Sequence, residues 1–105
     1  MATVIVKEGD GHTVRVLWKD GLGNAVTPNA CRYRVDCKTT GQSPLDWQSI
    51  AAASEVTIDI PGTANEIISD ANESEVRQIT VQANPGQSNQ RTVVGEYVVP
   101  NNAFL

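Results

Sequence analysis

The sequence is poor in the residues that build most catalytic and metal sites. It has one histidine and two cysteines. His12 has no second histidine and no cysteine pair at ligand spacing, which argues against a transition-metal site. Neither a Gly-x-Ser-x-Gly elbow nor a glycine-rich phosphate loop occurs. A nucleophile made of Cys31 or Cys37 with His12 is disfavoured, because both cysteines are predicted to face the core. We therefore expect a protein that is not an enzyme, with no cofactor and no bound metal.

Basic charge and long apolar runs are also scarce. Eight basic residues stand against 12 acidic ones, for a net charge of −4. This balance disfavours non-specific binding to nucleic acid, which depends on basic side chains that neutralise phosphates. No apolar run approaches the roughly 20 residues of a membrane span. Residues 1–8 lack the basic start and apolar stretch of a signal peptide. We expect neither a nucleic-acid nor a membrane partner, and no export.

Turn-forming residues divide the 105-residue chain at regular intervals, which is typical of all-β domains. The stretches between these turns are rich in β-branched residues, and several alternate between apolar and polar with a period of two. They are Thr3–Lys7, His12–Trp18, Cys31–Cys37, Asp46–Ala51, Glu55–Ile60, Glu75–Ala83 and Arg91–Val99. We predict an antiparallel β-sandwich of about seven strands over residues 1–99, followed by a C-terminal tail, residues 100–105.

The alternation also predicts which side chains form the core. The inward set is Val4 or Ile5, Val14, Val16, Trp18, Tyr33, Val35, Trp47, Ile50, Val56, Ile58, Ile60, Ile79, Val81 and Val99. One stretch, residues 62–74, has no alternation and is long for a hairpin loop. Ile67 and Ile68 are expected to plug the open end of the sandwich there, and a helical turn over Asn65–Ser69 is an option.

Several short motifs resemble those of fibronectin type III domains, and together they cover most of the chain. Val16-Leu17-Trp18 is similar to the Val-x-Trp of the family's second strand, and Tyr33-Arg34-Val35 to the Tyr-x-Val of its third. Trp47 follows that strand, as a second tryptophan commonly does in the family. Residues 77–84 align with the sixth-strand pattern, but Arg77 stands where the family has its corner tyrosine. The resemblance implies a fibronectin type III-like β-sandwich and does not specify a function.

The two cysteines are expected to be unpaired thiols in the core. Cys31 and Cys37 are six residues apart on one predicted strand, so their Cα atoms are ~20 Å apart, far beyond disulfide distance. Four acidic residues, Glu66, Asp70, Glu73 and Glu75, crowd into the long loop. We interpret this loop as a solvated acidic segment, and a bound divalent cation is the alternative.

Two features are candidates for an interaction surface. Arg32 and Arg34 are predicted to share the outer face of the sheet with Gln78, Thr80 and Gln82, on the neighbouring sixth strand of a fibronectin-like topology. They form either an ordinary solvated face or a basic patch that docks on a protein or a glycan. The tail ends in Phe104 and Leu105 beyond Pro100, which is expected to stop the last strand. This apolar end either folds back on its own domain or inserts into a neighbouring subunit.

The function is inferred by analogy with similar domains. Taken as a complete product of one domain, the chain resembles the virion accessory proteins of tailed bacteriophages. The resemblance implies a non-enzymatic structural protein, as a head decoration or a tail, neck or fibre component. Its expected partners are other virion structural proteins, in a homo-oligomer or a symmetric multicopy assembly built in the host cytoplasm. The alternative is a stand-alone module that binds carbohydrate or protein.

Overall fold

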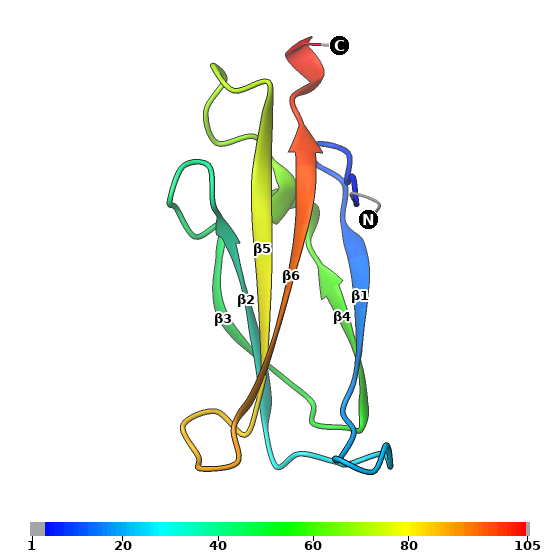
Figure 1. Cartoon of the computed structure of the whole chain (residues 1–105). Helices are drawn as coiled ribbons and strands as arrows, with labels where there is room; N and C mark the ends of the chain where they lie inside the picture. The colour runs from blue at the N-terminus through cyan, green and yellow to red at the C-terminus, as the bar shows by residue number, and fades with distance from the viewer. Residues whose placement is uncertain (1–3, 105) are drawn as a thin grey trace.

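The fold is all-β, as predicted. The computed structural model describes residues 4–104 and places six strands in two antiparallel sheets there. Figure 1 shows the strands of both sheets running along the long axis of the molecule. One sheet pairs β1 with β4, and the other has the order β3-β2-β5-β6. The bounds are β1 His12–Leu17, β2 Cys31–Cys37, β3 Leu45–Ile50, β4 Glu55–Ile60, β5 Ser74–Ala83 and β6 Arg91–Pro100.

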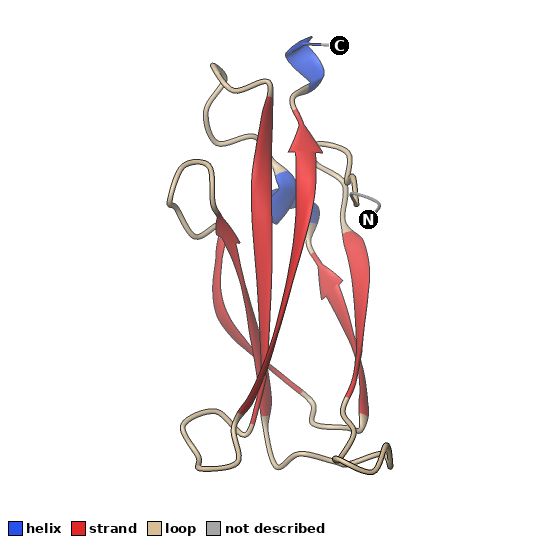
Figure 2. Ribbon diagram, in the orientation of Figure 1, coloured by secondary structure: helices blue, strands red, loops and turns tan. Residues whose placement is uncertain are grey.

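Helical structure within residues 4–104 is limited to two short 3-10 turns. These turns, η1 (Gly62–Asn65) and η2 (Asn102–Phe104), lie toward the same end of the molecule (Figure 2). Neither has the length or the apolar character needed to cross a membrane. The helical turn therefore starts at Gly62, three residues before the expected position.

The first expected strand, Thr3–Lys7, is reduced to a single bridge among the described residues. Ile5 forms a parallel bridge with Val98 of β6. Val6 donates its N–H to the Val98 carbonyl at 2.9 Å, and Val98 donates to the Val4 carbonyl at 2.9 Å. The segment thus joins the edge of the four-stranded sheet instead of lying beside β1.

Most of the predicted core is confirmed. The predicted residues that are buried between the sheets are Val16, Trp18, Tyr33, Val35, Val56, Ile58, Ile60, Ile79, Val81 and Val99, while Val14 and Ile50 are partly buried against them. The prediction that Val4 or Ile5 is buried is wrong, since their side chains are 58% and 65% exposed. Val6 is the buried residue of that segment. Tyr97 is a core residue that the pattern did not identify.

Trp47 was also predicted inward, and it lies instead on the outer face. The β2–β3 register shifts between Tyr33 and Val35. Gln48 pairs with the inward-facing Tyr33, so alternation along β3 sends Trp47 to the other side. There the ring meets the guanidinium of Arg32, whose Cζ lies 4.0 Å from the ring centroid. This cation–π contact covers part of the indole on the outer face.

The long loop is anchored by a fully buried ion pair, which corrects the prediction that Glu75 belongs to a solvated segment. Glu75 and Arg77 are both 0% exposed and point inward from β5, 3.0 Å apart between Oε1 and Nη1. Arg77 also donates to the carbonyls of Ala64 (3.1 Å) and Glu66 (2.6 Å). Glu75 accepts the backbone N–H groups of Ile68 and Ser69, both at 2.9 Å. Ile67 packs against the core as expected.

A second buried polar group, the Asn65 side chain, ties together three segments of the same end. Its amide donates to the Asp10 carbonyl at 2.7 Å and lies 3.0 Å from His12 Nδ1. Its Oδ1 accepts the Tyr97 hydroxyl at 2.7 Å. Burial raises the pKa of Tyr97 to about 12, although the nearby Arg77 charge opposes the shift. The hydroxyl therefore remains a donor throughout the physiological pH range.

Candidate functional site

The predicted interaction residues lie together on the outer face of the four-stranded sheet. The ladder between β2 and β5 pairs Arg32 with Gln82, Arg34 with Thr80, and Asp36 with Gln78. Directly opposed residues point to the same side of a sheet. With Trp47 of β3, the residues Arg32, Arg34, Gln78, Thr80 and Gln82 form a half-buried surface that we term the basic face.

The charge of Arg34 is neutralised within the molecule. Its Nε and Nη2 donate to Asp36 Oδ1 at 3.2 and 2.9 Å. Nη2 also donates to Ser43 Oγ at 2.7 Å, and Nη1 lies 3.7 Å from Asp46 Oδ1. Most of its donors are therefore occupied, and Arg34 serves mainly to hold β2 to the start of β3.

Arg32 differs from Arg34 in its hydrogen-bond and ion-pair partners, although the Arg34 Cζ also lies 5.4 Å from the Trp47 ring centroid. Its Nε donates to Gln82 Oε1 at 2.8 Å, and its guanidinium lies over the Trp47 ring. Within residues 4–104 it forms no ion pair, and its Nη atoms make no hydrogen bond. Gln82 and Trp47 thus fix the orientation of a planar cation whose outer donors remain available. A fork of this kind suits a carboxylate or another anionic oxygen pair.

The other predicted residues lie away from the basic face. Phe104 is 46% exposed in η2, and Leu105 lies outside the described residues. Cys31 and Cys37 are free and buried, as expected. Burial raises the pKa of the Cys31 thiol, which disfavours the reactive thiolate. Among the described residues no group of three or more histidine, cysteine or acidic side chains is placed to hold a metal ion.

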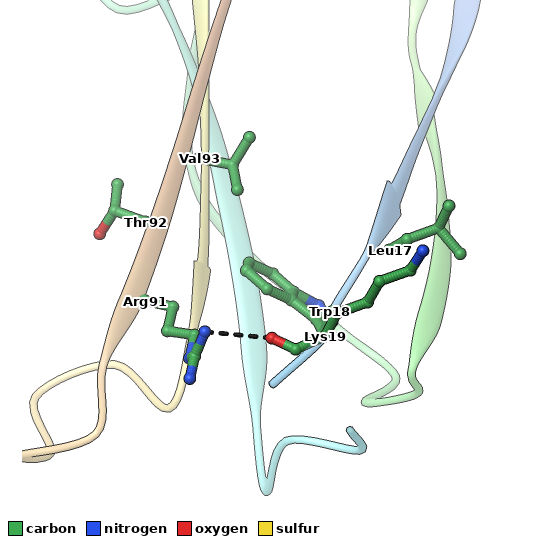
Figure 3. Close-up of a pocket in the computed structure, with 6 residues that line it drawn as sticks. All are labelled: Leu17, Trp18, Lys19, Arg91, Thr92 and Val93. Atoms are coloured by element: carbon green, nitrogen blue, oxygen red, sulfur yellow. Dashed lines mark hydrogen bonds between the residues drawn. The ribbon is translucent and has the colours of Figure 1, made fainter. Parts of the chain in front are cut away.

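A shallow groove between the two sheets was not foreseen from the sequence. It has a volume of about 470 Å³ and is lined by Leu17, Trp18, Lys19, Arg91, Thr92 and Val93. Figure 3 shows Trp18 and Val93 pointing into the gap between the end of β1 and the start of β6. Arg91 Nη1 spans this gap and donates to the Lys19 carbonyl at 3.1 Å. No sequence pattern could reveal the groove, because it depends on how the end of β1 and the start of β6 are spaced, with no strand of residues 4–104 between them.

In comparisons with known proteins, no protein-family model, no curated protein and no solved structure matches this chain.

Proposed function

We propose that the protein is a non-enzymatic structural module that docks in many copies on a larger assembly through its basic face. The observation that carries the proposal is the state of Arg32, a cation oriented by Trp47 and Gln82 and left without an anionic partner in residues 4–104. The chain as a whole is acidic. A single oriented cation on such a protein favours one docking orientation on an anionic surface.

The assembly that we propose is the virion of a tailed bacteriophage, with the chain as a head decoration or a tail, neck or fibre component. Support comes from the two-sheet architecture, which suits a fibronectin type III-like domain, and from the resemblance of the sequence to virion accessory proteins. A modest affinity for each copy is sufficient when many identical sites act together on one particle.

Incorporation into particles tests this proposal. Particles purified by density gradient from the source of the gene should contain the chain at a fixed copy number, measured by quantitative mass spectrometry. Arg32→Gln should reduce the incorporated amount, and the loss should be larger at low salt, because salt screens exposed charges. Arg15→Gln is the matched control, since Arg15 lies on the other sheet and pairs with Glu55.

Two outcomes would contradict the proposal. Absence of the chain from purified particles would reject the virion assignment. Equal incorporation of Arg32→Gln and Arg15→Gln would show that docking uses another surface. Binding of an acidic oligosaccharide by the free monomer would favour the alternative function, a glycan-binding module. That alternative is disfavoured by Arg32, whose guanidinium lies over the Trp47 ring on which a sugar would stack.

A further inference from the structure

The outer edge of β6 carries a row of backbone groups without partners. Val98 turns its N–H and C=O toward the Val4–Val6 segment at this edge. Hydrogen-bonding direction alternates along a strand, so Thr92, Val94 and Glu96 present their backbone groups on the same side. No backbone partner for these three edge residues occurs in the described part of the chain.

The other sheet edges are protected against pairing, and this one is not. The β2–β3 ladder is interrupted by a register shift, and β1 and β4 are six-residue strands with charged side chains on their outer face. Short length, irregularity and charge are the usual defences of an edge strand. By contrast β6 forms an unbroken ten-residue ladder with β5, and its Thr92–Gly95 stretch contains no charge and no proline.

Side chains along this edge are unusually exposed for apolar residues in a strand. Val93 is 43% exposed although it points toward the groove, and Val94 is 54% exposed on the outer face. Both valines would be covered by a further strand added beside β6. The groove in Figure 3 borders the start of this edge, because Thr92 and Val93 of β6 are among the residues that line it.

We infer that the strand added at this edge is β6 of a second copy of this chain, in antiparallel pairing with Val94 on the two-fold axis. Thr92 and Glu96 lie two residues before and two residues after Val94. With Val94 on the axis, Thr92 of each copy therefore faces Glu96 of the other, and Val94 faces Val94 of the second copy. Each such pair exchanges two backbone hydrogen bonds. The edge is therefore complementary to itself, which a two-fold interface requires.

The spacing of the outward residues and the neighbouring segment define the register of this dimer. Antiparallel pairing places Thr92 of each copy opposite Glu96 of the other on the outer face, where Glu96 keeps its own ion pair with Lys38. Arg91 lies on the inner face, opposite Ala83, and donates to the Lys19 carbonyl, so it takes no part in the pairing. Beyond Glu96, the Val4–Val6 segment already occupies the edge. The contact is therefore confined to Thr92–Glu96, and its small area predicts a weak dimer.

This inference goes beyond the proposed function and does not use Arg32. The dimer would join two four-stranded sheets into one continuous sheet, with both basic faces on the same side. Arg32→Gln should leave dimerisation unchanged, so failure of the dimer and failure of the docking proposal are distinguishable.

Sedimentation equilibrium across a range of concentrations tests the dimer. The average mass of the natural sequence should rise toward that of a dimer, while Val94→Lys should remain monomeric, because two lysines would meet at the two-fold axis. Thr80→Lys is the matched control and should dimerise normally, since Thr80 faces Val94 from β5 on the same outer surface, one strand away from the edge.

Amide hydrogen exchange of the natural sequence provides a second measurement that needs no variant. Raising the concentration should slow exchange at Thr92, Val94 and Glu96 by tenfold or more, while the amides of Val93 and Gly95, directed toward β5, change little. A mass that stays monomeric at millimolar concentration would overturn the inference. So would a dimer in which those three amides still exchange as fast as in the monomer, or one that a folded Val94→Lys variant forms equally well.

Discussion

Removal of the buried carboxylate by Glu75→Gln should destabilise the protein and flatten its acid sensitivity. Burial disfavours the charged form of Glu75, but hydrogen bonds from Ile68, Asn72, Ser69 and Arg77 outweigh it and lower its pKa from 4.5 to about 2. Such a shift corresponds to about 3 kcal/mol of folding free energy, at about 1.36 kcal/mol per pKa unit. Because the pKa is lower in the folded state, the stabilisation is complete above about pH 4.5. It is lost as the pH falls toward 2.

Urea unfolding at a series of pH values measures this effect. Between pH 5 and pH 2 the natural sequence should lose about 3 kcal/mol more than Glu75→Gln. At pH 7 the variant should be less stable by a similar amount or more, because it leaves the fully buried Arg77 without its counter-charge. Glu73→Gln removes an exposed carboxylate from the same loop and controls for the change in net charge. Parallel pH profiles of Glu75→Gln and the natural sequence would refute the reasoning.

Three further predictions concern the core, the thiols and the C-terminal turn. Trp18→Ala should cost roughly 3–5 kcal/mol in urea unfolding, because the indole is buried between the sheets, and a loss below about 1 kcal/mol would show that it is not a core residue. Thiol titration should find two groups in the denatured, unreduced protein and almost none in the native one, whereas a disulfide within the monomer would contradict the single-strand placement of Cys31 and Cys37. Deletion of residues 103–105 should leave the melting temperature nearly unchanged, since Phe104 is half exposed. If the proposed virion function holds and the apolar end inserts into a neighbouring subunit, the deletion should also weaken incorporation into particles; unfolding of the truncated chain would instead make the tail part of the core.

The strands were predictable from the sequence because their signal is local. For Cys31–Cys37 and Glu55–Ile60, the alternation predicts the same strand bounds and the same buried side chains that the structure shows. Trp47 was mispredicted although alternation from Ile50, three residues later and correctly placed inward, already directs it to the outer face. What the sequence could not show is the register shift between Tyr33 and Val35, which returns Leu45 to the inner side. Likewise, the first segment could be recognised as extended, but its own residues do not encode whether it joins β1 or β6.

The basic face could be assembled from the sequence, but the difference between its two arginines could not. Alternation places Arg32 and Arg34 on one side of β2, and nothing in the strand distinguishes them. Both guanidinium groups lie over the Trp47 ring, but their roles diverge because Ser43 and Asp46 reach Arg34 from the following segment, while Gln82 reaches Arg32. These contacts are set by loop geometry and pairing register, which local patterns do not determine.

Under the proposed fibronectin type III-like resemblance, Arg77 stands where the family has its corner tyrosine, and its contacts show what an arginine does there. In immunoglobulin-like sandwiches, the corner tyrosine fixes the connection before its strand by one hydrogen bond to backbone a few residues upstream. Here the partners are Ala64 and Glu66, 13 and 11 residues upstream in a longer loop. A guanidinium has several donors in a fixed fork, so it bonds both carbonyls at once. Its buried charge then requires a carboxylate beside it, and Glu75, two positions earlier on the same inward face of β5, supplies one.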